Sequence, residues 1–157
     1  MSETDGTTVA EPLTDAVIMA KIARNFPPCI VMLGGEMIEV DQASRRVVMG
    51  FVATPQFCHS EVIVQGGFLT AMLDAAMSHA VMAGSGLTLS PPTLELKISF
   101  LAPGNPGRFR AEGVALKLGK SVGFLEGWLY NEAGELIARA TSTCRLVPIA
   151  KRGRAFA

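Results

Sequence analysis

One acidic residue, Asp74, stands inside the most apolar segment of the chain. Residues 68–83 contain no proline or glycine and are rich in alanine, leucine and methionine, which predicts a helix. Aspartate is a poor helix-interior residue because its side chain competes for backbone hydrogen bonds, and a buried carboxylate costs free energy unless it is paired or solvated. Asp74 is therefore either satisfied by Thr70 and Ser78, one turn away on each side, or it serves a ligand or a reaction.

A glycine pair, Gly66-Gly67, opens this helix. The N–H groups of a first helical turn have no helical partner, and the helix dipole favours negative charge there. Glycines let a carbonyl group approach closely, so the pair is suited to stabilise an oxyanion, although a tight bend into the helix is the alternative interpretation. Two helical turns separate Gly66 from Asp74. An acyl thioester could span this distance, with one group at Gly66 and an adjoining part at Asp74. The site could also require a second subunit to complete it.

The segments around this helix are predicted to be strands and one further helix. An apolar stripe predicts a helix that begins near Thr14 and ends at Pro27-Pro28, and Gly84-Ser85-Gly86 ends the central helix. Residues 93–101 alternate apolar and polar side chains, which predicts a half-buried strand. The other strands are expected at residues 37–40, 45–54, 108–118, 121–130 and 135–147.

Tight turns join most of the strands, and short turns force neighbouring strands to be antiparallel. The sequence therefore predicts an α+β fold in which one antiparallel sheet covers a central helix, with an extra helix near the N-terminus. We expect a single domain over residues 13–148, a disordered arm at residues 1–12 and a basic tail at residues 149–157.

The composition narrows the possible functions. The chain has 157 residues, 49% of them apolar, and its 14 basic and 14 acidic side chains balance, whereas nucleic-acid-binding proteins normally carry a basic excess. Three cysteines without a CxxC spacing and two histidines argue against a disulfide framework or a metal site. The first residues lack a secretory pattern, and residues 68–83 are too short and polar to span a bilayer. We expect a cytoplasmic protein that binds neither nucleic acid nor membranes.

Three segments resemble the hotdog-fold thioesterases, in the PaaI-like branch of the 4-hydroxybenzoyl-CoA thioesterase superfamily. The family's signature of a glycine pair followed by a helical aspartate is similar to VQGGFLTAMLDAAMSHAV. The family's alternating strand with its proline-containing turn is similar to LELKISFLAPGNPGRFRAEG. Its closing hairpin is similar to SVGFLEGWLYNEAGELIARATSTCRLV.

The resemblance implies a curved antiparallel sheet wrapped around one long helix, and hydrolysis of acyl- or aryl-CoA thioesters without a metal or cofactor. It also implies a homo-oligomer, a dimer or a dimer of dimers, in which two sheets become continuous and the active sites lie at the subunit interface. On the same basis Asp74 is the catalytic general base or nucleophile, and the Gly66 N–H polarises the thioester carbonyl. Thr93 helps to place the attacking water, reaching in from the partner subunit.

Two positions depart from the family pattern. Gln65 stands where the family usually has histidine; its amide can donate a hydrogen bond to the thioester oxygen but cannot carry a proton. His59 stands where the family often has asparagine, and it either supplies polarity or is a plain loop residue. Gly67, His59 and Ser78 are expected to contact the substrate.

Several other residues are weaker candidates for a functional role. His79 lies five residues from Asp74, off its stripe, and is expected to be a packed or interface residue. Cys58 adjoins His59, but adjacent side chains rarely have the geometry of a nucleophile and its base. Arg108 and Arg110 could meet CoA phosphates, but solvated surface charge is the favoured interpretation of each one singly.

The leading hypothesis is an acyl-CoA thioesterase that depends on Asp74 and Gly66. A non-catalytic acyl-CoA- or ligand-binding hotdog protein is the alternative, and Gln65 is the feature that favours it. A hotdog dehydratase would require a histidine beside Asp74 for proton abstraction, and the sequence places none there.

Overall fold

The computed structural model describes residues 12–149. The expected arm at residues 1–12 and the basic tail at residues 149–157 lie outside the described residues, apart from Pro12 and Ile149. None of the helices in the described part combines the length and the apolarity that crossing a bilayer requires. The helices are α1 (Asp15–Arg24), α2 (Pro28–Met32), the single 3-10 turn η1 (Pro55–Phe57) and α3 (Gly66–Gly84).

Six strands form one antiparallel sheet with the order β1-β2-β7-β8-β9-β6. Two further pairs, β3–β4 and β5–β10, are short. The strands are β1 (Glu36–Asp41), β2 (Arg46–Ala53), β3 (Cys58–Ser60), β4 (Ile63–Val64), β5 (Leu89–Ser90), β6 (Thr93–Phe100), β7 (Gly107–Leu118), β8 (Val122–Asn131), β9 (Leu136–Arg145) and β10 (Val147–Pro148).

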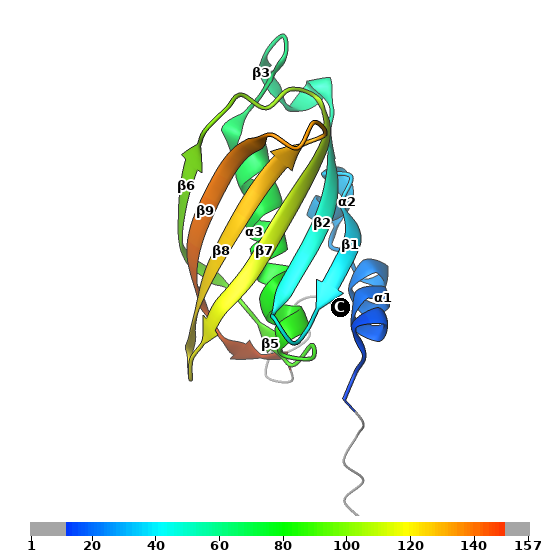
Figure 1. The fold of residues 1–157 in the computed structure, drawn as a ribbon, viewed down its shortest axis with the longest axis vertical. Helices are drawn as coiled ribbons and strands as arrows, with labels where there is room; N and C mark the ends of the chain where they lie inside the picture. Colours follow the sequence, from blue (N-terminus) through cyan, green and yellow to red (C-terminus); the bar gives the residue numbers. More distant parts are fainter. Residues whose placement is uncertain (1–11, 150–157) are drawn as a thin grey trace, which may run out of the picture.

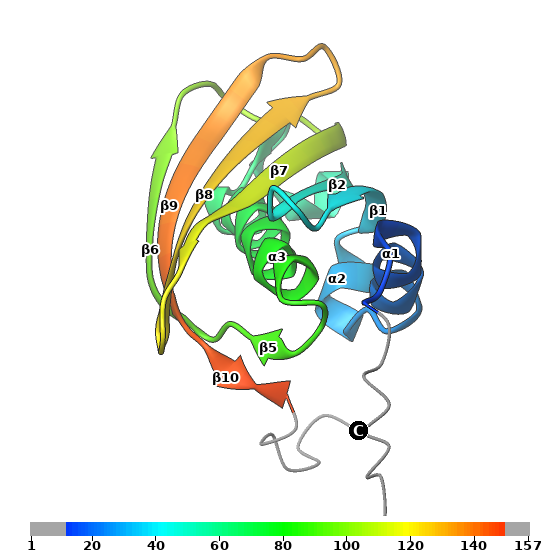
Figure 2. The ribbon, with the colours of Figure 1, turned by 60° about the horizontal axis from the view of Figure 1, so that its bottom comes forward.

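The sheet curves around α3, which runs along its concave side (Figure 1). Seen from the lower end, α1 and α2 lie beside α3 on the side of β1, and β6 forms the opposite edge (Figure 2). The expected architecture, a curved antiparallel sheet around one long helix with an additional N-terminal helix, is confirmed. The short helix α2 was not expected, although Pro28 at its first position is a common way to begin a helix.

Small residues let α3 lie directly on the sheet. Phe109, Ala111 and Gly113 of β7 all point inward, as alternation along a strand requires. A Cβ atom at Gly113 would lie 2.4 Å from the carbonyl carbon and oxygen of Ala76, so the helix backbone itself occupies the space of a side chain. On β8, a Cβ atom at Gly127 would meet only the flexible side chains of Met77 and Leu73, at 3.0 and 3.1 Å.

The apolar composition of residues 68–83 suggests a helix buried on every side, but α3 is only half-buried along one stripe. Ala71, Asp74, Ser78 and Met82 are only half-buried, whereas Leu73, Ala76 and Ala80 are fully covered. The stripe follows the helical period of 3.6 residues, so its members share the face directed away from the sheet.

The expected burial of one face of β6 is also wrong in part. Leu96 and Ile98 are half-buried, but Leu94 is 60% exposed and Phe100 is 51% exposed. The reason is the position of β6 at the sheet edge, where it pairs with β9 on one side and presents the other side unpaired within residues 12–149.

Substituting Gly113 by alanine tests the close approach of α3. We expect Gly113→Ala to lower the free energy of unfolding by about 2–3 kcal/mol, because the helix backbone must shift to admit the methyl group. Gly127→Ala is the matched control, with an expected loss of about 1 kcal/mol because side chains can rotate away. Urea unfolding of the three proteins measures both values. Equal losses at the two positions would contradict the backbone contact.

Candidate active site

A cavity of about 950 Å³ lies along the half-buried stripe of α3. One wall is formed by α3, with Asp74 in it, and the opposite wall comes from α1, α2 and the segment between them. The lining residues are Lys21, Ile22, Asn25, Pro27, Cys29, Ile30, Leu33, Ala71, Asp74, Ala75, Ser78, His79, Met82, Leu87, Ser90 and Ile149. The half-buried stripe is therefore exposed to this cavity.

Asp74 is held by a threonine hydroxyl. Thr93, the first residue of β6, donates a hydrogen bond of 2.8 Å from its Oγ1 to Oδ1 of Asp74. Thr70 instead donates to the backbone oxygen of Gly66, and no hydrogen bond joins Ser78 to Asp74 within residues 12–149. The sequence alternative in which Thr70 and Ser78 satisfy the carboxylate is therefore wrong, and Oδ2 keeps its lone pairs for other donors.

The expected origin of Thr93 needs correction. The resemblance implied that this residue reaches in from a partner subunit, yet its hydroxyl bonds Asp74 of its own chain. The cause is the topology: β6 follows α3 after a short connection and lies at the sheet edge beside β9, so its first residue comes next to the middle of the helix.

The N-terminus of α3 keeps one backbone donor free. Gln65 is the N-cap, and its Oε1 accepts a hydrogen bond of 2.6 Å from the N–H of Gly67. The N–H of Phe68 bonds the Gln65 backbone oxygen at 3.0 Å. The N–H of Gly66 has no acceptor among the described residues, so Gly66 offers the free donor that an oxyanion needs.

This arrangement modifies the expected roles of Gly67 and Gln65. The Gly67 N–H is already occupied, so it reaches a substrate only if the Gln65 side chain turns away. The same bond uses the amide oxygen of Gln65 and leaves its Nε2 group as a donor. Gly66 also has to be small, because a Cβ atom there would lie 2.9 Å from Cζ of Phe100.

The remaining sequence candidates separate into two groups. Ser78 lines the same cavity as Asp74, one turn further along α3. His59 is exposed on β3 and does not line that cavity. The second wall of the cavity, which includes Ile22 and Ile30, was not predicted from the sequence. A signal for it exists in the apolar residues that continue beyond Pro28.

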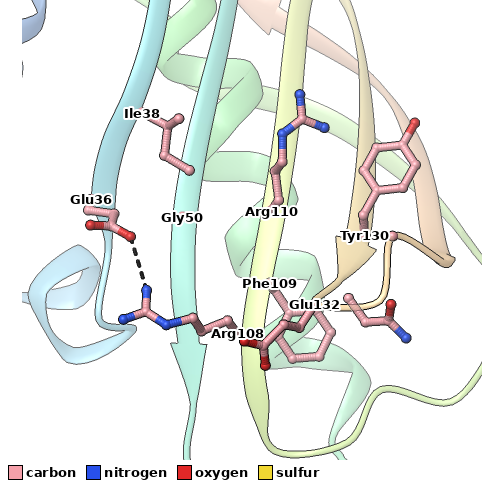
Figure 3. Close-up of a pocket in the computed structure, with 10 residues that line it drawn as sticks. Glu36, Ile38, Gly50, Arg108, Phe109, Arg110, Tyr130 and Glu132 are labelled. Carbon is pink, nitrogen blue, oxygen red and sulfur yellow. Dashed lines mark hydrogen bonds and ion pairs between the residues drawn. The ribbon is translucent and has the colours of Figure 1, made fainter.

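Arg108 and Arg110 lie on the outer face of the sheet, because they alternate with the inward-facing residues of β7. They line a smaller surface pocket of about 430 Å³ (Figure 3). Arg108 is 3.4 Å from a carboxylate oxygen of Glu36, and Arg110 is 3.4 Å from one of Glu112. The guanidinium of Arg110 also lies 5.7 Å from the centre of the Tyr130 ring. Both arginines are thus ion-paired on the face of the sheet opposite to α3.

The chain is similar to known proteins that are described as thioesterases. A family model described as the thioesterase superfamily matches residues 63–138. A candidate thioesterase from Ralstonia eutropha, related to phenylacetic acid degradation, is 33% identical in a match that covers 82% of this chain and 98% of that one, with a TM-score of 0.75. No curated protein matches the chain.

Two more distant structures share the fold. The E. coli PaaI protein from the phenylacetic acid degradation operon is 22% identical over 82% of this chain and 91% of that one, with a TM-score of 0.73. A Streptococcus mutans protein bound to acetyl-CoA is 16% identical over 73% of this chain and 89% of that one, with a TM-score of 0.65.

Two titratable groups near Asp74 are held neutral. Burial lowers the pKa of His79 below its ordinary 6.5, and a hydrogen bond of 2.7 Å between Nδ1 and the Ala75 carbonyl opposes this shift. The ring of Phe26 packs edge-on against His79 at 5.8 Å. Burial likewise raises the pKa of the Cys144 thiol, and the negative charge of Asp74 adds to that shift.

The buried histidine predicts a loss of stability in mild acid. The folded-state pKa of His79 lies below its unfolded value. As the pH falls, this histidine therefore takes up a proton in the unfolded chain before it does so in the folded chain. The free energy of unfolding should fall below about pH 6.5, by up to about 1.4 kcal/mol per pH unit. Urea unfolding at pH 7.5, 6.5 and 5.5 should show this component in wild type and in the exposed-site control His59→Gln. A slope that persists in His79→Gln would refute the assignment.

Proposed function

We propose that this chain, which belongs to the PaaI-like branch of the hotdog-fold thioesterase superfamily, hydrolyses acyl- or aryl-CoA thioesters to a free acid and CoA. One observation carries the proposal: Asp74 lies in the wall of a large cavity, and its Oδ1 is fixed by Thr93. That arrangement supplies an oriented carboxylate beside a space that can hold an acyl group.

Asp74 is the proposed base of the reaction. Its free Oδ2 takes a proton from a water molecule, whose oxygen forms a bond to the thioester carbon. Collapse of the resulting oxyanion breaks the C–S bond, and the CoA thiolate leaves with the proton that Asp74 took from the water, which restores the carboxylate. Direct attack by the Asp74 carboxylate on the same carbon is the second route: it breaks the C–S bond, releases the CoA thiolate and leaves a mixed anhydride, which water hydrolyses to the free acid and the Asp74 carboxylate. In either route the Thr93 hydroxyl keeps the carboxylate in one orientation.

The backbone of Gly66 is the proposed oxyanion donor. Its N–H is unpaired within the described residues and lies at the positive end of the α3 dipole. The Nε2 group of Gln65 is the proposed second donor, and the use of Oε1 by the Gly67 N–H supports this role because it leaves the amide N–H groups free of that contact. A neutral amide suffices for this role, since stabilising the oxyanion requires a hydrogen bond and no transferable proton.

Asp74 and Gly66 of one chain are too far apart to act on one carbonyl. Eight helical residues span about 12 Å along the axis, whereas each group must approach within about 3 Å of its reacting atom. Two copies of α3 that run in opposite directions would bring Gly66 of one chain to Asp74 of the other. The active form that we propose is therefore a homo-oligomer with each site shared between subunits.

The free edge of β6 is the proposed contact between subunits. It has no strand partner on its outer side among residues 12–149, and apolar side chains accompany it, with Leu94 60% and Leu101 56% exposed. Uncovered edges of this kind invite pairing with another strand. Two β6 strands that pair would join the sheets into one continuous sheet.

The acetyl-CoA bound by the Streptococcus mutans relative of the same fold supports CoA as the carrier of the substrate.

Removing the negative charge of Asp74 is the direct test of catalysis. We expect Asp74→Asn to lower kcat by about 10³-fold, within the range that general bases contribute, with little change in thermal stability. The measurement is free-thiol release from a panel of short, medium, long and aromatic acyl-CoAs.

Asp41→Asn is the matched control, because Asp41 is the last residue of β1, is not among the residues that line the cavity, and accepts a hydrogen bond from the Ser44 N–H that asparagine can also accept. Its turnover should equal that of wild type. If the wild-type protein binds acyl-CoA but releases no thiol from any substrate, this result would contradict the proposed enzyme activity and favour a binding protein.

A charge at the β6 edge should separate the subunits. Leu94→Glu places a carboxylate where an apolar side chain would be buried, so we expect the dimer Kd to rise by at least about tenfold and turnover to fall with it. Sedimentation velocity over a concentration series measures the Kd. Leu116→Glu, at a leucine 51% exposed on β7, should leave the dimer intact. A fully active monomer would contradict a shared site.

A further inference from the structure

The wall opposite Asp74 has a composition that restricts the ligand. It comes from α1 and α2, where Ile22 and Ile30 are 4% and 6% exposed, and from Leu33, which is 2% exposed. On the α3 side Ala71, Ala75 and Met82 line the cavity, together with the polar side chains of Asp74, Ser78 and His79. The cavity therefore has apolar surfaces on both sides of Asp74, and a ligand group there exchanges water for hydrocarbon contacts.

The charges that line the cavity disfavour acyl groups that carry a carboxylate of their own. Asp74 is the one acidic side chain among the described residues that line the cavity, and Lys21, on the exposed surface of α1, is the one basic side chain. His79 is buried and neutral, so it adds no positive charge. An acyl group that ends in its own carboxylate would place two negative charges in this apolar space, which is costly without a buried cation.

Size excludes very short acyl groups as preferred ligands. The cavity volume of about 950 Å³ lies near the upper end of small-molecule sites. A two-carbon acyl group would leave most of the apolar surface uncovered, whereas a longer chain gains contacts with every methylene that enters.

We infer that the cavity between α1–α2 and α3 is the acyl-binding pocket of the enzyme, and that it selects uncharged, apolar acyl groups of medium chain length or larger. Ile30 on α2 and Ala71 on α3, on its two sides, set the length that fits. This inference rests on the proposed function for the position of the thioester at Asp74, but the apolar selectivity of the cavity can be measured by binding alone.

Two substitutions change the pocket in opposite directions. Ala71→Leu adds three carbons on a half-buried position of α3 and should shorten the preferred chain. Ile30→Ala removes three carbons from α2 and should admit longer chains. Val31→Ala is the matched control, because Val31 is the next residue of α2, is 63% exposed and does not line the cavity.

The experiment measures kcat/KM for acetyl-, butyryl-, octanoyl-, dodecanoyl-, benzoyl- and succinyl-CoA. In wild type we expect an increase of about fourfold per added methylene up to the length that fills the pocket, and no advantage for the charged succinyl group. Ala71→Leu should lower the ratio of kcat/KM for octanoyl-CoA to that for butyryl-CoA by at least about tenfold. Ile30→Ala should move the optimum toward dodecanoyl-CoA, and Val31→Ala should match wild type. A thermal unfolding curve of each variant shows that it is folded.

A parallel binding measurement separates this inference from the proposed function. Calorimetric titration of Asp74→Asn with octanoyl-CoA and acetyl-CoA reports the pocket without turnover, and the Ala71→Leu substitution is repeated in that background. If wild type hydrolyses acyl-CoA but neither substitution moves the chain-length profile, the pocket assignment is overturned and the enzyme stands. If no thioester is hydrolysed, but octanoyl-CoA binds more tightly than acetyl-CoA and Ala71→Leu removes the difference, the pocket stands without the enzyme. Absence of both effects overturns both.

Discussion

The contact between the backbone of α3 and Gly113 fixes the geometry on which the rest of the molecule depends. With the carbonyl of Ala76 in the place of a side chain, the backbone of the helix lies directly against the sheet. Asp74 is two residues before Ala76 on the same helix, so the depth of that contact also sets the distance from the carboxylate to β6. The hydrogen bond from Thr93 to Asp74 follows from this placement. A helix held a few ångströms higher by larger side chains would carry Asp74 away from that hydroxyl.

Some polar groups of the candidate site are fixed by hydrogen bonds, and others have no hydrogen-bond partner among the described residues. Gln65 occupies the Gly67 N–H and Thr93 occupies one oxygen of Asp74, yet the Gly66 N–H and the second carboxylate oxygen remain available within the described chain. Polar groups of a stable fold usually find partners. Groups that are left free at the end of a rigid helix and in the wall of a cavity are suited to a substrate that supplies the partners.

The sequence predicted the parts of this protein that local patterns encode. The central helix was visible from residues 68–83, and the strands and turns from alternation and glycine-proline signals. Asp74 stood out because a carboxylate conflicts with its apolar neighbours. The partner of Asp74 could not be read locally, because Thr93 lies nineteen residues away and only the tertiary fold brings it near. The exposure of Leu94 and the wall supplied by α2 escaped prediction for the same reason: strand order and helix docking decide them, and periodicity within one segment does not.

The strand order has a consequence for how the chain reaches this structure. Neighbouring segments form the β7–β8 and β8–β9 hairpins through short turns, so little chain entropy opposes them. β6 has no such neighbour: Thr93 pairs with Cys144, and β7, β8 and most of β9 lie between these two residues in the chain. Contacts of long sequence separation are the slow ones in folding. β6 can therefore join the sheet only where β9 is already in place, and the Thr93 hydroxyl reaches Asp74 only through this contact of long sequence separation.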